Sequence, residues 1–185
     1  MEDSEIVNLY WQRSDTAIRE TSRKYGGYCQ RIAYNISRSR EDAEECVNDT
    51  WLRAWHAMPT ERPAILSAFL GCITRSLALD QWRSRHRQKR GGGELPLALD
   101  ELDHCIPAPG SPQQRLEQKE LEAAIARFVS ALPETEKKVF IARYWAFVPV
   151  AEIAKNLDFS PGKIKSMLFR LRKRLKEHLQ EVELW

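Results

Sequence analysis

The sequence has no uninterrupted apolar segment of membrane length and no N-terminal export signal. A membrane-spanning helix needs about 20 consecutive apolar residues, and a secretory signal needs a shorter apolar core behind basic residues. Cysteines in a protein without such a signal are expected to be free thiols in a reducing compartment. We therefore expect a cytoplasmic protein that does not insert into a membrane.

The sequence also lacks the residue spacing of a metal site or a catalytic centre. A structural zinc site needs closely spaced cysteine or histidine pairs, and the four histidines add no such pattern. No activated nucleophile and no glycine-rich phosphate-binding loop is recognisable. We expect a binding protein and not an enzyme, with no catalytic residue, no metal and no cofactor. The cysteines are far apart, at Cys29, Cys46, Cys72 and Cys105.

Basic residues are absent from residues 91–114, a segment with four glycines, four prolines and four acidic side chains. Residues 1–90 carry 15 basic and 12 acidic side chains, and residues 115–185 carry 14 basic and 10 acidic ones. Because glycine and proline interrupt helices, this pattern predicts two domains, 1–90 and 115–185, joined by an acidic linker at 91–114. Two basic blocks favour two nucleic-acid contacts. The apolar side chains of the linker are compatible with a flexible tether or with an extended segment that lies along a partner.

Apolar residues recur with helical periodicity in both domains, and no segment alternates convincingly as a strand would. We expect an all-α fold of two small helical domains. Before the linker, helices are predicted at Ser4–Gln12, from a cap at Ser14 or Asp15 to Ile36, from a capping box at Ser39–Asp42 to Met58, and at Ile65–Lys89. After the linker they are predicted at Pro112–Leu132, Glu134–Tyr144, Pro149–Leu157 and Ser160–Gln180.

The most informative segment is Ser160–Lys176, which holds seven Lys or Arg and no Asp or Glu. Ser160 suits a helix cap and Pro161 suits the first helical position. A short helix and a break precede it, and Asp158 in that break is expected to be left-handed. This is the layout of a helix-turn-helix that binds DNA. A solvated surface or a membrane-surface helix also explains an isolated basic helix, but the preceding helix and the cap favour DNA. One apolar stripe faces inward, formed by Ile164, Leu168, Leu171 and Leu175.

The first domain has two candidate binding surfaces. Acidic residues in the first turn of a helix match its dipole, but Asn48 and Asp49 lie too far along for that explanation. The helix of residues 65–89 ends in a basic run long enough for several phosphate contacts. The acidic strip comprises Glu41, Glu45, Asn48, Asp49 and Leu52, and the basic run is Arg83–Arg90.

These segments, in this order, resemble the extracytoplasmic-function (ECF) sigma factors of bacterial RNA polymerase. The resemblance covers nearly the whole chain and implies a protein that directs the polymerase to specific promoters and initiates transcription. It also implies a sigma-region-two-like bundle followed by a sigma-region-four-like bundle. The matching motifs are Arg40–Trp55, Ile73–Asp80, Leu132–Glu134, Arg143–Tyr144, Ala151–Ala154 and Lys163–Arg170.

The resemblance assigns a partner to each surface. The Asp42–Trp55 helix is implied to dock on the clamp of the largest polymerase subunit, through Glu45, Asn48, Asp49 and Leu52. Minus-ten recognition and melting is implied for the Pro59–Ala64 loop and the helix after it, through Arg62, Arg75, Ser76, Leu79, Arg83, Arg85 and Arg87. The helix-turn-helix is implied to read the minus-thirty-five element and to meet the flap of the second-largest subunit. Its candidate DNA contacts are Ser160, Lys163, Lys165, Ser166, Phe169, Arg170 and Lys173.

Two further expectations follow from the resemblance. The linker is implied to run through the active-centre cleft of the polymerase, and an inhibitory anti-sigma factor is a possible partner. The chain departs from the family pattern at Ser76, where Asn is common, and at Asp158, where Gly is usual. We therefore do not expect the promoter preference of another family member to apply to this chain.

Two other classes of protein would account for only part of this pattern. A stand-alone helix-turn-helix regulator would explain Ser160–Lys176, but not the acidic strip or the basic helix end before the linker. A helical protein that binds only other proteins would leave both basic blocks as solvated surfaces.

Overall fold

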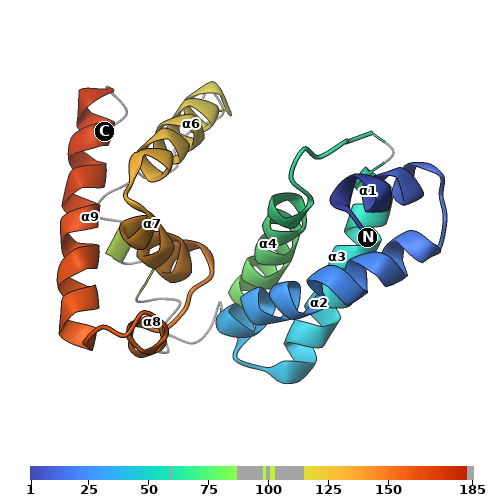
Figure 1. Cartoon of the computed structure of the whole chain (residues 1–185), viewed down its shortest axis with the longest axis horizontal. Helices are drawn as coiled ribbons and strands as arrows, with labels where there is room; N and C mark the ends of the chain where they lie inside the picture. Colours follow the sequence, from blue (N-terminus) through green and yellow to red (C-terminus); the bar gives the residue numbers. More distant parts are fainter. Residues whose placement is uncertain (59, 87–97, 99–100, 103–114, 183–185) are drawn as a thin grey trace. The chain divides into compact units, whose positions relative to one another are not determined.

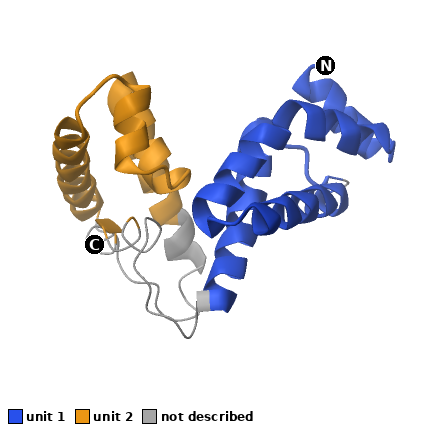
Figure 2. Ribbon diagram, turned by 90° about the horizontal axis from the view of Figure 1, so that it is seen from below, with its two compact units in different colours: residues 1–91 blue, residues 92–185 orange. Residues whose placement is uncertain are grey.

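The computed structural model describes residues 1–58, 60–86, 98, 101–102 and 115–182, and it divides into two compact units, Met1–Gly91 and Gly92–Trp185 (Figures 1 and 2). All regular structure in these residues is helical, which confirms the predicted all-α fold. None of the described helices is long and apolar enough to cross a membrane. Most of the predicted linker lies outside the described residues, so its boundaries stay a prediction.

The described residues of the first unit form four helices. α2, α3 and α4 pack against one another, and α1 packs on α2. Because all three longer helices share one apolar core, each has one buried face and one face left for binding. The helices are α1 (Asp3–Trp11), α2 (Thr16–Ser37), α3 (Arg40–Ala57) and α4 (Leu66–His86), close to the predicted ranges.

The connection between α2 and α3 shows how local sequence sets the helix ends. Arg38 ends α2 in the left-handed conformation, with φ of 56°. Ser39 then caps α3, because its Oγ accepts a hydrogen bond from the Asp42 N–H at 3.2 Å. The predicted cap is therefore confirmed. α3 enters the core with its apolar face inward, through Ala43, Val47, Thr50, Ala54 and Met58.

Two buried threonines join α3 to α4. The hydroxyls of Thr50 and Thr74 lie 3.1 Å apart, and each lies 2.8 Å from a carbonyl one turn earlier. The Cys46 thiol donates to the Thr74 carbonyl at 3.4 Å. Burial raises the pKa of Cys46 to about 12, so the thiol keeps its proton and remains a donor. The polar groups at this interface are thus satisfied within the core.

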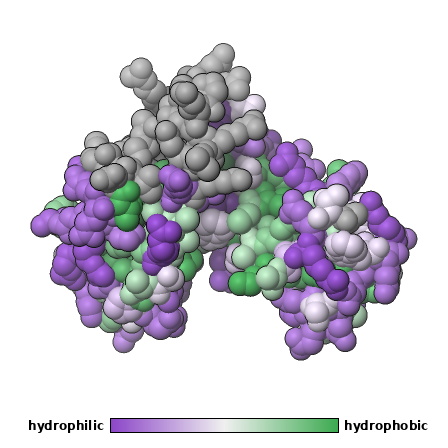
Figure 3. All heavy atoms as spheres, turned by 90° about the horizontal axis from the view of Figure 1, so that it is seen from above, coloured by the Kyte–Doolittle hydropathy of each residue, from purple (hydrophilic) through white to green (hydrophobic). Residues whose placement is uncertain are grey.

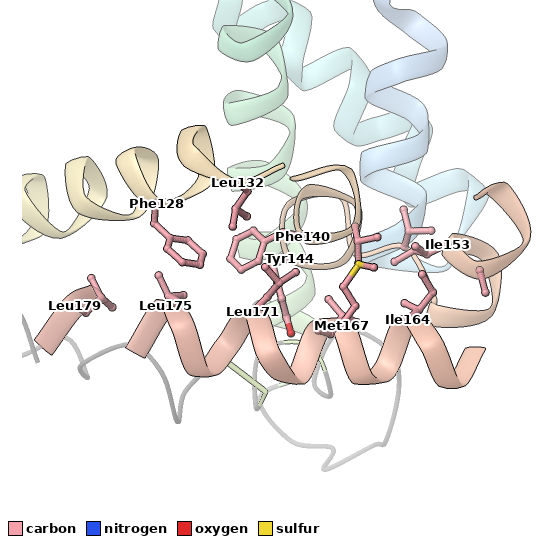
Figure 4. Close-up of a cluster of buried hydrophobic side chains, with 14 of the residues drawn as sticks. Phe128, Leu132, Phe140, Tyr144, Ile153, Ile164, Met167, Leu171, Leu175 and Leu179 are labelled. Carbon is pink, nitrogen blue, oxygen red and sulfur yellow. The ribbon is translucent and has the colours of Figure 1, made fainter. Parts of the chain in front are cut away.

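The second unit is built around its last helix. α9 packs against α6, α7 and α8, and its apolar side chains point into the space between them (Figure 4). The predicted stripe is confirmed, since Ile164, Leu168, Leu171 and Leu175 are each at most 2% exposed. The elements are α6 (Arg115–Ala131), α7 (Glu134–Phe140), the π-helical turn η2 (Ile141–Trp145), α8 (Val150–Asn156) and α9 (Pro161–Glu181).

The end of α7 differs from the prediction of a single α-helix to Tyr144. The α-helix ends at Phe140, and in the following π turn the Ala146 N–H donates to the Ile141 carbonyl at 3.0 Å. Phe147 then adopts a φ of 52° and is fully buried. Helical periodicity did not predict this turn, because the buried Phe147 and the wider hydrogen bond are set by tertiary packing.

On the face drawn in Figure 3, each unit shows hydrophilic side chains along its outer edge and hydrophobic side chains within that edge. Against this background the exposed large apolar side chains are informative. Phe169 is 63% exposed and Leu52 is 57% exposed, and both belong to predicted binding surfaces.

Leu171→Ala should lower the free energy of unfolding of the second unit by about 2–5 kcal/mol, because Leu171 is fully buried and its loss leaves a cavity. Hydrogen exchange of the full chain is the measurement: amides of α6 and α9 should exchange faster. Those of α2–α4 should be unchanged because they belong to the other core. Lys173→Ala, an exposed change on the same helix, is the control and should shift stability by at most about 0.5 kcal/mol. Equal loss of protection in both units would contradict the separation of the cores.

Candidate nucleic-acid interface

α8 and α9 form a helix-turn-helix. Asp158 adopts a φ of 55°, which confirms the predicted left-handed residue. The Phe159 N–H donates to the Ala154 carbonyl at 2.9 Å and closes the turn. Ile153 and Ala154 on α8 are each 2% exposed, so the turn holds α8 and α9 together over a packed contact.

The first turn of α9 is capped and open to solvent. The Ser160 Oγ accepts a hydrogen bond from the Lys163 N–H at 3.2 Å, and Pro161 occupies the first helical position, as predicted. Gly162 follows, and a Cβ atom placed there would meet nothing within 4 Å. The start of α9 is therefore rigid and leaves room for a close partner.

The outer face of α9 and its cap residue together carry all seven residues predicted to contact the minus-thirty-five element. Lys163 Nζ lies 3.4 Å from the centroid of the Phe159 ring, and Lys173 Nζ lies 3.7 Å from Glu177 Oε1. Within the described part of the chain, no other ion pair involves these seven residues. The face is thus positive and largely free to meet an anion. Its members, all exposed, are Ser160, Lys163, Lys165, Ser166, Phe169, Arg170 and Lys173.

The acidic strip of α3 is exposed as predicted. Glu45, Asn48, Asp49 and Leu52 are spaced so that they share one helix face, and all four are exposed. Since the opposite face of α3 is buried, this strip has a fixed orientation. It offers carboxylate groups beside one exposed leucine, an arrangement suited to a basic protein surface.

Two side chains of α4 already contact this strip. Gln81 Nε2 donates to Glu45 Oε2 at 2.9 Å. Arg85 pairs with Asp42, and its Nη2 lies 3.9 Å from Glu45 Oε2. Glu45 and Arg85 were predicted to bind different partners, and here they lie next to each other. Because these groups are exposed to water, such contacts are readily exchanged for others.

The predicted minus-ten residues differ in their exposure. Arg62, Ser76, Arg83 and Arg85 are exposed, and Arg83 lies 3.8 Å from Asp80. Arg75 is half-buried, and burial lowers its pKa. Leu79 is only 7% exposed and packs in the core beside the buried Ala78, so its contact with DNA stays a prediction. Arg87 lies outside the described residues.

Arg62 is held by α1. Its Nη2 donates to Asn8 Oδ1 at 2.5 Å, and its guanidinium lies 5.6 Å from the centroid of the Trp11 ring. The first helix therefore positions a side chain of the loop before α4. Sequence reasoning missed this contact, because Asn8 and Arg62 are 54 residues apart.

The second unit contains a buried charge that sequence reasoning also missed. Arg143 is fully buried, and its guanidinium contacts the Glu101 carboxylate, with Nη2 2.9 Å from Oε1. The Tyr144 hydroxyl donates to Glu101 Oε2 at 3.0 Å, and Arg172 Nη1 on α9 lies 3.2 Å from the same oxygen. Burial raises the pKa of Tyr144, so its hydroxyl stays protonated. Glu101, from the predicted linker, thus contacts Arg172 of α9.

One signal in the sequence pointed to this cluster. Arg143 stands among apolar residues in the sequence, and a buried guanidinium needs a carboxylate. The nearest strongly acidic segment is the predicted linker. The choice of Glu101 among its four acidic residues required the structure.

The sites described above offer charge, hydrogen bonds and a few exposed apolar groups. Within the described residues, no group of three or more His, Cys, Asp or Glu side chains is placed to hold a metal ion. The arrangement is suited to binding a polyanion on one surface and a basic protein on another.

Comparison with known proteins agrees with this geometry. The family model for Sigma-70 region 2 matches residues 22–88, and the model for Sigma-70 region 4 matches residues 122–175. The chain is 30% identical over 151 residues to the probable RNA polymerase sigma factor RfaY of Xanthomonas campestris pv. campestris. It is 26% identical over 160 residues to the ECF RNA polymerase sigma factor SigE of Mycolicibacterium smegmatis. The chain belongs to the ECF sigma-factor family.

The matches cover most of this ECF sigma-factor chain but less of its relatives. They span 80% and 86% of the chain, but only 36% of RfaY and 60% of SigE. The solved structure of CnrH in complex with the cytosolic domain of CnrY is 19% identical, covers 97% of both chains and has a TM-score of 0.45.

Each of the two sigma-region matches lies within one of the two compact units. The region 2 match begins in α2 and includes all of α3 and α4, and the region 4 match runs from α6 into α9. Glu101 lies outside both matches, as does α1 with Asn8. The contacts that these residues make in this sigma factor are therefore additions to the matched regions.

Glu101→Ala should lower the free energy of unfolding of the second unit by about 3 kcal/mol, because it removes a carboxylate that contacts the buried Arg143. Glu101→Gln should fall between this variant and the wild type, since it keeps hydrogen-bonding groups but removes the charge. Hydrogen exchange of α7 and α9 amides in the full chain is the measurement. Glu177→Ala removes an exposed partner, 3.7 Å from Lys173, and should change little. Wild-type protection in Glu101→Ala would show that Glu101 does not neutralise Arg143.

Proposed function

We propose that this protein directs bacterial RNA polymerase to specific promoters and initiates transcription there. The observation that carries the proposal is the match of sigma regions 2 and 4 to two separate compact units, each of which exposes a charged face. The role is one of binding and positioning, and RNA synthesis would belong to the polymerase. A stand-alone helix-turn-helix regulator would account for α8 and α9, but it would not account for the region 2 unit.

In this proposal the acidic strip of α3 docks on the clamp of the largest polymerase subunit. The exposure of all four predicted residues supports this role, and so does the combination of carboxylates with Leu52. Clamp binding would compete with Gln81 and Arg85 for Glu45. Because both of these contacts are exposed, that exchange has little cost.

Promoter DNA would be held at two places. The minus-ten element would meet α4 and the loop before it, with exposed Arg62, Ser76 and Arg83 as the leading candidates. Basic side chains there suit the backbone of a melted strand. The outer face of α9 would enter the major groove of the minus-thirty-five element, and the second unit would also meet the flap of the second-largest subunit. An anti-sigma partner remains a prediction.

Run-off transcription with purified core polymerase and a genomic promoter library tests the proposal. We expect RNA products that start at a defined set of promoters only when the protein is added. Addition without any new start site would contradict the proposed function. The promoter selected in this way is the template for the experiments that follow.

Asp49→Arg should abolish binding to core polymerase and leave the fold intact, because Asp49 is exposed at the centre of the acidic strip. A pull-down with core polymerase measures the affinity, and circular dichroism checks the helical content. Glu44→Arg is the matched control, a charge reversal of an exposed residue on the same helix that is not among the four predicted contacts. If Asp49→Arg keeps wild-type affinity, α3 does not dock through this face.

Removing one phosphate contact should reduce the salt dependence of promoter binding. Lys163→Ala is expected to weaken the complex of polymerase with promoter and to lower the slope of log K against log salt by about 0.9. Titration at several salt concentrations gives the slope. Lys138→Ala removes the same charge from an exposed position on α7 and should leave the slope unchanged. Equal slopes for wild type and Lys163→Ala would exclude Lys163 as a phosphate contact.

A further inference from the structure

Phe169 lies on the solvent-exposed side of α9, away from the buried stripe. Its side chain is 63% exposed, while the apolar residues of the inward stripe are at most 2% exposed. Within the described residues no ring stacking and no cation–π contact involves Phe169. An aromatic ring left in water forgoes the free energy of burial, so its exposed position points to a partner.

The neighbours of Phe169 define the charge of that partner. Lys165 and Ser166 lie one turn before it and Lys173 lies one turn after it, on the same face of the helix. Arg170 is adjacent, and all four are exposed. An apolar ring surrounded by cations suits a polyanion that also carries an apolar group.

Duplex DNA has one apolar group on the base edges of its major groove, the C5-methyl of thymine. The faces of paired bases are stacked, so a side chain that enters the groove from a helix meets base edges and not base faces. Gly162, two turns before Phe169, has no side chain, and an added Cβ would be in open space. The helix backbone can therefore approach the groove closely on the face that carries Phe169.

We propose that Phe169 determines specificity in the upstream promoter element by packing on the C5-methyl group of a thymine. The lysines and arginine around it hold the flanking phosphates and set its depth in the groove. This inference rests on the proposed function, and it adds a particular base and a particular atom to it.

Thymine-to-uracil scanning tests the inference, because uracil lacks only the methyl group. Each thymine of the minus-thirty-five element is replaced singly by deoxyuridine in the selected promoter, and the stability of the complex with polymerase and the full-length protein is measured. We expect one or two positions at which uracil weakens the complex about fourfold, the factor that corresponds to burial of one methyl group. Phe169→Ala should weaken the complex on thymine DNA and abolish the difference between thymine and uracil.

Two variants serve as controls. Arg170→Ala should weaken binding but keep the thymine-to-uracil ratio, because it removes a cation and not the ring. Phe169→Leu should keep part of the ratio, because leucine is apolar but smaller. A pull-down with core polymerase without DNA checks whether Phe169→Ala weakens the protein contact instead.

The outcomes separate this inference from the proposed function. Promoter-specific complexes whose stability is insensitive to uracil at every position would overturn the role of Phe169 alone. The same holds if Phe169→Ala keeps the uracil effect, or if it mainly weakens binding to polymerase without DNA. No promoter-specific complex for the wild type would overturn the proposed function itself.

Discussion

The burial of one apolar face on each short helix is the constraint on which the structure depends. Most of the stability of a helix in a protein comes from the packing of its apolar face, so these helices depend on one another to form. In the second unit the stripe from Ile164 to Leu179 on α9 meets α6, α7 and α8. Once that face is buried, the orientation of every other side chain on α9 is set. The outward orientation of the basic side chains of α9 is therefore a consequence of the packing of the core.

The same constraint acts on the first unit with charges of the opposite sign. α3 buries its apolar face against α2 and α4, and its carboxylates face solvent. Both proposed sites are thus side chains on rigid helices, which hold geometry better than loops do. The exception is the loop with Arg62, and there Asn8 and Trp11 of α1 restrain the side chain.

Features that depend on neighbours in the sequence could be predicted, and features that depend on distant residues could not. The caps at Ser39 and Ser160 and the turn at Asp158 follow from local chemistry. The π turn does not, since a helical pattern cannot show where one residue is inserted. Leu79 looked like a surface residue by analogy, but tertiary packing placed it in the core. The contacts of Arg85 with α3 depend on how α3 and α4 pack against each other. That packing could not be predicted from the sequence.

The position of Glu101 in the chain has a consequence for the order of folding during synthesis. It comes 42 residues before Arg143 and 71 residues before Arg172 in the chain. During synthesis the first unit leaves the ribosome complete, and domains generally fold as units from the N-terminal end. Glu101 is synthesised after the first unit and before Arg143 and Arg172, the two basic residues that it contacts. The second unit can close around its buried arginine only when α9 has emerged. The first unit therefore completes its fold before the second unit does.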